Sequence, residues 1–132
     1  MTDIKSMNME ELKELMVQIG EKPFRAKQIY GWLHEHLVTS YDEMANIPKS
    51  LKEKLKDYPI TVLEELDVQT SKVDGTRKYL FRLSDGNMIE SVLMRYKYGN
   101  SVCISSQAGC RMGCRFCAST IGGLTRNLLP SE

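Results

Sequence analysis

The chain has 132 residues, and its 18 basic and 17 acidic side chains leave a formal net charge of only +1. This length suffices for one domain, or one and a half, with a buried core, and the balanced charge excludes the strongly basic field of many nucleic-acid-binding proteins. The sequence has neither an apolar run of about 18 residues, which a transmembrane helix requires, nor the apolar segment of a signal peptide near its N-terminus, so we expect no membrane partner.

Two amphipathic helices are predicted near the N-terminus. Asn8 can cap the first, because Glu11 three residues later completes a capping box, and Gly20 can end it. Its apolar stripe comprises Met9, Leu12, Leu15, Met16 and Ile19. Pro23 suits the first turn of the second helix, and the short link makes the two helices neighbours. The stripe of the second helix comprises Ala26, Ile29, Tyr30, Leu33 and Leu37.

Three cations surround the start of the second helix: Lys22, Arg25 and Lys27. Free backbone amides and the helix dipole favour an anion such as phosphate at this position. The three side chains are therefore candidate phosphate ligands, with ordinary helix-surface charge as the alternative.

A third, shorter helix is predicted between Pro48 and Pro59, with Leu51 and Leu55 facing inward. A short turn of helix at residues 41–45 is expected before it. Lysines lie around the third helix with acidic residues among them, which favours a solvated surface over a binding patch.

A β-meander is predicted from about Leu63, where the apolar period changes to two. Asp74-Gly75 and Asp85-Gly86 are signals for two-residue hairpin turns. They divide the segment into a three-stranded antiparallel meander. Its strands are expected at residues 63–73, 76–83 and 87–94.

Glu90 is expected on one face of the third strand, among the apolar residues Met88, Val92 and Met94. A carboxylate on an apolar face is costly unless it is paired or protonated. Loss of hydration would raise the pKa of Glu90 toward that of a usable general base. Two other interpretations stay open: an ion pair with a cation such as Arg82, or burial of the opposite face of the strand.

Residues 101–105 are predicted to form a short strand, the first of a parallel (β/α) barrel, which leads into a loop containing Gly109. Parallel barrels carry their chemistry in the loops at the C-terminal ends of strands. The fold class is therefore α+β. We expect a small helical domain over residues 1–60, a β-hairpin extension over residues 61–100, and the start of a barrel over residues 101–132.

Three of the four cysteines, Cys110, Cys114 and Cys117, form a C-x-x-x-C-x-x-C run in the predicted loop. Thiolates at this spacing can converge on one metal centre, and they select zinc or iron–sulfur clusters. A closed zinc site and an electron-transfer cubane each need four protein ligands, whereas three leave a coordination position free for a small molecule. The spacing therefore favours a [4Fe–4S] cluster with one open iron.

Other readings of the cysteines stay open. They include a zinc site completed by His34 or His36, a thioredoxin-like dithiol at Cys114 and Cys117, and an inert cluster. Cys103, seven residues before the run, is either a small buried hydrophobe or a fourth cluster ligand. Clustered cysteines without a secretory signal indicate reduced thiols in the cytoplasm.

Residues 103–117 read CISSQAGCRMGCRFC, with an aromatic residue before the last cysteine. This string, with Arg-Asn-Leu at residues 126–128, resembles radical S-adenosylmethionine enzymes. More narrowly it resembles the RlmN/Cfr family of RNA adenine methyltransferases, on the RlmN side of that family. The likeness extends to residues 74–81, 89–92 and 23–29, and so covers nearly the whole chain.

The resemblance implies a radical S-adenosylmethionine enzyme that methylates C2 of adenine in 23S rRNA and tRNA. Its cofactors would be a [4Fe–4S] cluster on Cys110, Cys114 and Cys117, and S-adenosyl-L-methionine bound at the open iron. Glu90 falls on the position of the family's catalytic acid/base. Cys103 matches the thiol that helps to release the methylated product.

The resemblance also implies an RNA-binding, helix-hairpin-helix-like N-terminal domain, which makes Lys22, Arg25 and Lys27 candidate RNA contacts. Its other expectations are an electron donor such as flavodoxin or ferredoxin, a cytoplasmic location and a monomer. The likeness is to the N-terminal portion of such an enzyme, so the isolated chain is expected to be inactive. An RNA-binding module without chemistry, and a zinc or electron-transfer protein, are the alternatives.

Overall fold

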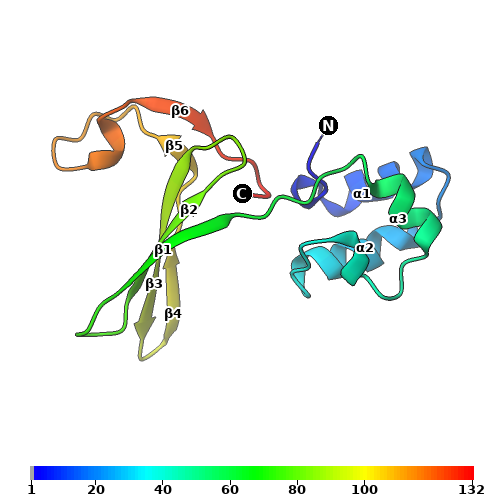
Figure 1. Cartoon of the computed structure of the whole chain (residues 1–132), viewed down its shortest axis with the longest axis horizontal. Helices are drawn as coiled ribbons and strands as arrows, with labels where there is room; N and C mark the ends of the chain where they lie inside the picture. The colour runs from blue at the N-terminus through cyan, green and yellow to red at the C-terminus, as the bar shows by residue number, and fades with distance from the viewer. Residues whose placement is uncertain (1) are drawn as a thin grey trace. The chain divides into compact units, whose positions relative to one another are not determined.

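The computed structural model describes residues 2–132, which fall into two compact units. The helical unit contains the α-helices and comprises the chain up to Thr61, and Ser131 is also assigned to it. The strand unit contains the strands and comprises Val62–Pro130 and Glu132 (Figure 1). The expected division into three parts, with boundaries after residues 60 and 100, stays a prediction. The strand β4, Gly99–Cys103, contains residue 100. No helix within residues 2–132 is long and apolar enough to cross a membrane.

The helical unit consists of α1 (Met9–Gln18), α2 (Phe24–His34) and α3 (Lys49–Leu55) with two short 3-10 turns, Ile4–Ser6 and Tyr41–Glu43. The predicted capping box of α1 is confirmed. The Asn8 side chain accepts hydrogen bonds from the amides of Glu10 and Glu11 at 2.9 and 3.0 Å, and the Glu11 carboxylate accepts one from the Asn8 amide at 2.7 Å. A cap of this kind stabilises a helix by about 1 kcal/mol.

Asp3 joins the two ends of the helical unit. Its buried carboxylate accepts hydrogen bonds from the amide of Lys5 at 2.7 Å and from the amide of Thr61 at 2.6 Å. The amide of Ile4 also donates to the carbonyl of Pro59 at 3.1 Å. The segment after α3 is therefore fixed against the chain start.

The core of the helical unit contains the predicted apolar stripes, except that Met9, Ile19 and Tyr30 are only partly buried against it and Leu37 lies outside it. Leu37 was expected inside, but it is 69% exposed and has a positive φ of 54°. Because α2 ends at His34, Leu37 no longer follows the helical period, and Val38 is buried in its place. The core is formed by Ile4, Leu12, Leu15, Met16, Ala26, Ile29, Leu33, Val38, Met44, Ile47, Leu51 and Leu55.

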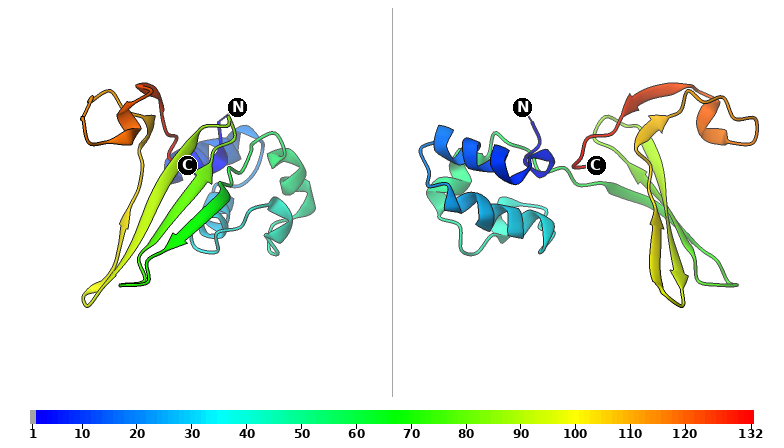
Figure 2. Two further views of the ribbon diagram at one scale, coloured as in Figure 1. Left: turned by 60° about the vertical axis from the view of Figure 1, so that its left-hand side comes forward. Right: turned by 180° about the vertical axis from the view of Figure 1, so that it is seen from behind.

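The strand unit is built on an antiparallel sheet of order β1-β2-β3-β4 (Figure 2). Its strands are β1 (Glu64–Thr70), β2 (Arg77–Arg82), β3 (Met88–Tyr96) and β4 (Gly99–Cys103). The first three confirm the predicted meander. The short strands β5 (Gln107–Gly109) and β6 (Leu124–Asn127) form a separate antiparallel pair.

The two hairpin loops are longer than predicted. The amide of Leu83 donates to the carbonyl of Asn87 at 2.8 Å, which leaves residues 84–86 in the loop. The amide of Ser71 likewise donates to the carbonyl of Thr76 at 2.8 Å and closes residues 72–75. Gly86 has a φ of 85°, as in a three-residue hairpin loop whose last residue is left-handed. A loop longer by one residue moves every side chain of the next strand to the opposite face.

The strand predicted at residues 101–105 overlaps β4, which ends at Cys103. β4 pairs antiparallel with β3, with Tyr96 opposite Gly99 across the turn at Lys97 and Tyr98. Gly99 has a φ of 129°, a conformation that glycine adopts readily, and it lets the chain return at once. Within residues 2–132 all paired strands are antiparallel.

Candidate functional site

The three clustered cysteines lie on the loop that joins β5 to β6 (Figure 1, orange). The base of the loop is closed by Gly109 and Gly123, where the Cys110 amide donates to the Gly123 carbonyl at 3.0 Å. Gly109 has a φ of 77°, and a Cβ added to it would overlap the Gly123 carbonyl oxygen. Only glycine therefore fits this close approach of two backbones.

Hydrogen bonds inside the loop order its second half. The Thr120 hydroxyl donates to the carbonyl of Cys117 at 2.9 Å and is 3.2 Å from the carbonyl of Cys114. The amide of Cys117 donates to the carbonyl of Cys114 at 3.2 Å. These bonds place Cys114 and Cys117 on one tight turn.

The donor chemistry of this loop fits an iron–sulfur cluster. Cys110, Cys114 and Cys117 are free thiols, each partly exposed, and soft thiolates are the ligands that such clusters use. The amide of Met112 lies 3.5 Å from the sulfur of Cys110, a contact of the kind that tunes cluster sulfurs. Within residues 2–132, however, no three His, Cys, Asp or Glu side chains converge to a distance that would hold a metal ion.

The histidines proposed as alternative zinc ligands lie on or just after α2, and each packs against an aromatic ring at a tilt. The centroid of His34 is 4.3 Å from that of Tyr30, and the centroid of His36 is 4.6 Å from that of Trp32. Both imidazoles are thus engaged in local packing within the helical unit.

Glu90 lies on the exposed face of β3, so its predicted burial is wrong. Its side chain is 56% exposed, and its Oε1 lies 3.2 Å from the Nζ of Lys78 on β2. The buried side of β3 carries Ile89, which is 6% exposed. Glu90 is therefore paired with a cation, and the opposite face of the strand is the buried one, as the two alternative interpretations stated. The cation is Lys78 rather than Arg82, which pairs with Glu64 at 2.6 Å.

Cys103 and Glu90 share one face of the sheet. Cys103 is paired with Val92, which is two residues from Glu90 on β3, and side chains two apart on a strand point to the same side. Such diagonal neighbours lie about 7–8 Å apart. The hydroxyl of Ser105 donates to the carbonyl of Glu90 at 2.7 Å and holds the chain after β4 against β3. Cys103 is exposed, which rules out its reading as a buried hydrophobe.

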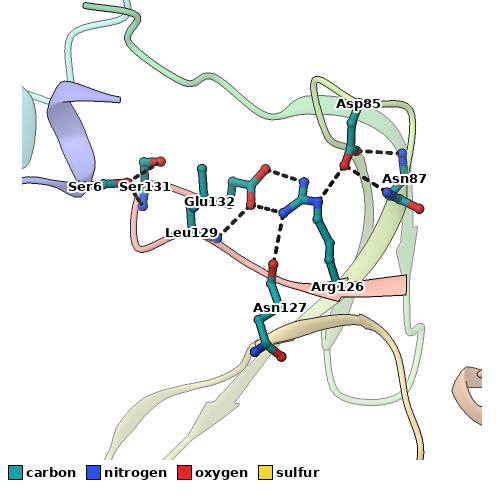
Figure 3. Close-up of polar contacts among 8 residues, drawn as sticks. All are labelled: Ser6, Asp85, Asn87, Arg126, Asn127, Leu129, Ser131 and Glu132. Carbon is teal, nitrogen blue, oxygen red and sulfur yellow. Dashed lines mark hydrogen bonds and ion pairs between the residues drawn. The ribbon is translucent and has the colours of Figure 1, made fainter. Parts of the chain in front are cut away.

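Arg126 forms a network with two carboxylates (Figure 3). Its Nε donates to Asp85 at 2.6 Å, and its two terminal nitrogens donate to the two oxygens of Glu132, each at 2.7 Å. The Glu132 carboxylate also accepts from the Leu129 amide at 2.8 Å. The guanidinium holds the pKa of both carboxyls below their usual range, and the carboxylates in turn raise the pKa of Arg126.

The candidate RNA contacts Lys22, Arg25 and Lys27 lie around the first turn of α2, as predicted. Lys22 and Lys27 are exposed, and Arg25 is half-buried. The guanidinium of Arg25 donates to the side chain of Gln28 at 2.7 Å and lies 4.9 Å from the centroid of the Phe24 ring. Arg25 is therefore partly engaged, and the RNA role of the three cations stays a prediction.

Comparison with known proteins finds relatives that are similar over the whole length of the chain. Residues 2–60 match the family described as the ribosomal RNA large subunit methyltransferase N-terminal domain. The chain is 62% identical over its full length to a probable dual-specificity RNA methyltransferase RlmN of Lachnospira eligens, and 63% identical over 98% of its length to the protein of the same name from Lachnoclostridium phytofermentans. It spans only 38% and 37% of these two relatives.

A solved structure shares the fold. The crystal structure of a radical SAM methyltransferase from Sphaerobacter thermophilus superimposes with a TM-score of 0.87 at 39% identity. The match covers 97% of this chain and 38% of that protein. The mixed helical and antiparallel architecture described above is therefore that of the matching portion of a radical SAM methyltransferase.

Proposed function

We propose that this chain, whose residues 2–60 match the ribosomal RNA large subunit methyltransferase N-terminal domain family, is the N-terminal part of an RlmN-type radical SAM methyltransferase. The observation that carries the proposal is the 62% identity over the whole chain to the Lachnospira eligens relative. The proposed substrates are adenines of 23S rRNA and tRNA, modified at C2 in the cytoplasm by a monomeric enzyme.

The cysteine loop supplies the cofactor site in this proposal. Cys110, Cys114 and Cys117 would hold a [4Fe–4S] cluster, which when bound supplies an electron to S-adenosylmethionine at its open iron. A donor such as flavodoxin or ferredoxin would provide that electron. The chain contributes the tight backbone approach at Gly109 and the amide of Met112 beside the sulfur of Cys110.

The exposed face of β3 and β4 supplies the proton-transfer groups. The carboxylate of Glu90 would accept the proton from C2 of the adenine, and the thiol of Cys103 would assist release of the methylated RNA. Lys78, 3.2 Å from Glu90, restrains the carboxylate. A base of this kind contributes about 10²–10⁴-fold to rate, and the shared sheet face supports action on a single nucleotide.

The test is a chimera in which this chain replaces the corresponding segment of the Lachnospira eligens relative. We expect transfer of labelled methyl from S-adenosylmethionine to a 23S rRNA transcript, reduced at least about 100-fold by Glu90→Gln. Glu65→Gln is the control, because Glu65 is an exposed carboxylate of the same sheet with no proposed role. A folded, iron-loaded chimera without methyl transfer would contradict the proposal, as would a Glu90→Gln variant as active as the control.

An RNA-binding module without chemistry is the second candidate function. The observation that favours it is the group of three cations at the first turn of α2, two of them exposed. The two functions are compatible in an intact enzyme.

A further inference from the structure

The hairpin between β3 and β4 ends in two exposed, stacked tyrosines. The rings of Tyr96 and Tyr98 lie 5.0 Å apart, centroid to centroid, at an angle of 10°. Their side chains are 48% and 81% exposed. Tyr96 is oriented by a hydrogen bond from its hydroxyl to the sulfur of Met94 at 3.4 Å. The turn itself requires only Gly99, with its positive φ, so the tyrosines are not needed to form it.

The charged residues next to this pair in the sequence are both cations. Arg95 and Lys97 flank Tyr96 and are exposed, and neither forms an ion pair within the described part of the chain. Residues 91–131 contain no aspartate or glutamate. The tip therefore attracts an anionic partner.

The tyrosine pair stands on the sheet face that carries Glu90 and Cys103. Side chains alternate along β3, so Tyr96 points to the same side as Glu90, and Cys103 faces that side from β4. Six residues of strand separate Tyr96 from Glu90, a distance of about 20 Å at a rise of about 3.3 Å per residue. A single nucleotide cannot reach both places, whereas a polynucleotide lying along this face can.

We propose that the stacked pair Tyr96–Tyr98, with Lys97 beside it, is a platform for an unpaired base of single-stranded RNA. Stacking on aromatic rings combined with phosphate contacts to cations is how proteins hold single-stranded nucleic acid. The base lies against the exposed ring of Tyr98, and Lys97 contacts an adjacent phosphate. That this RNA is also the methylation substrate rests on the proposed function; the stacking itself does not.

The binding test uses the whole chain and a fluorescein-labelled single-stranded oligoribonucleotide, followed by anisotropy. Tyr98→Ala is expected to weaken binding about tenfold, and Tyr98→Phe, which keeps the ring, to stay within about twofold. Lys97→Ala is expected to reduce the slope of log affinity against log salt by about 0.7. The control is Val73→Ala, because Val73 is 97% exposed in the loop between β1 and β2 and has no cation–aromatic pair beside it.

Equal affinity of the wild-type chain and Tyr98→Ala would overturn the platform and assign the tyrosines to a contact with protein. Absence of any RNA binding would overturn it as well. In the chimera, Tyr98→Ala should raise KM for RNA about tenfold without changing kcat. An active chimera with an unchanged KM refutes the platform alone, whereas an inactive chimera with Tyr98-dependent RNA binding refutes the proposed function alone.

Discussion

Gly109→Ala is expected to destabilise the β5–β6 pair and its cysteine loop by roughly 3 kcal/mol. An L-residue at a positive φ costs about 1–2 kcal/mol, and overpacking typically costs about 1–3 kcal/mol. Here the added Cβ meets the Gly123 carbonyl oxygen, which is backbone and cannot rotate away. The measurement is hydrogen exchange of the Cys110 amide, whose bond to Gly123 closes the loop.

Gly113→Ala is the matched control for this prediction. Gly113 lies on the same loop with a φ of 65°, but a Cβ there meets nothing within 4 Å. It should therefore show only the conformational cost of about 1–2 kcal/mol. Fluorescence of Trp32, the sole tryptophan, follows the unfolding of the helical unit. This unfolding should be unchanged in both variants. Similar losses of protection in both variants would refute the close approach at Gly109.

Arg126→Ala is expected to lower the free energy of unfolding of the strand unit by about 3 kcal/mol. The reason is that the Glu132 side chain is only 2% exposed, so the variant leaves a buried carboxylate with the Leu129 amide as its remaining partner. Arg82→Ala is the control: it removes an ion pair to Glu64 whose partners are 47% and 56% exposed, worth less than about 1 kcal/mol. Urea unfolding followed by the amide signals of β6 gives both values.

The Arg126 effect should depend on pH with a definite sign. The guanidinium lowers the pKa of Asp85 and Glu132 in the folded chain, so their stabilisation is fully present above the unfolded values of about 4. It is lost as the pH falls through the lower, folded values. The difference between wild type and Arg126→Ala should therefore shrink on acidification, and a difference that is constant down to acid pH would contradict the network.

Local signals in the sequence predicted the local parts of the fold. The Asn8 cap, the apolar stripes of α1 and α2, and the glycines of the hairpins act within a few residues, and these are confirmed. The prediction that Leu37 is buried was wrong because the apolar period was extended beyond His34, where α2 ends. The Asp85–Arg126 pair joins residues 41 positions apart, and no periodicity or spacing marks such a pair.

The error at Glu90 concerns which face of β3 is buried, since Ile89 and not Glu90 points to the buried side, and the length of one loop contributes to it. A two-residue turn at Asp85-Gly86 would have placed Glu90 opposite Phe81, on the face of the stacked rings of Tyr79 and Phe81. The actual loop of residues 84–86 places it opposite Leu80 and diagonal to Lys78. Asp-Gly alone does not distinguish the two loops, because glycine supplies the left-handed residue in both.

The thiols of the candidate site were found by their spacing, and the face shared by Glu90 and Cys103 emerged only with the strand register. Glu90 and Cys103 were singled out by the local pattern and by the family resemblance, and their catalytic roles stay predictions. Their mutual placement required the pairing of Val92 with Cys103, which follows from the short turn at Lys97 and Tyr98.

The most direct measurement is the iron and sulfide content of the chain after anaerobic reconstitution. We predict one [4Fe–4S] cluster per wild-type chain, with a visible spectrum that changes when S-adenosylmethionine is added, and no cluster in the triple variant Cys110→Ala, Cys114→Ala, Cys117→Ala. Cys103→Ala should retain the cluster, since Cys103 is not a ligand in this account. Equal iron and sulfide in the wild type and the triple variant, or stoichiometric zinc in place of iron, would contradict it.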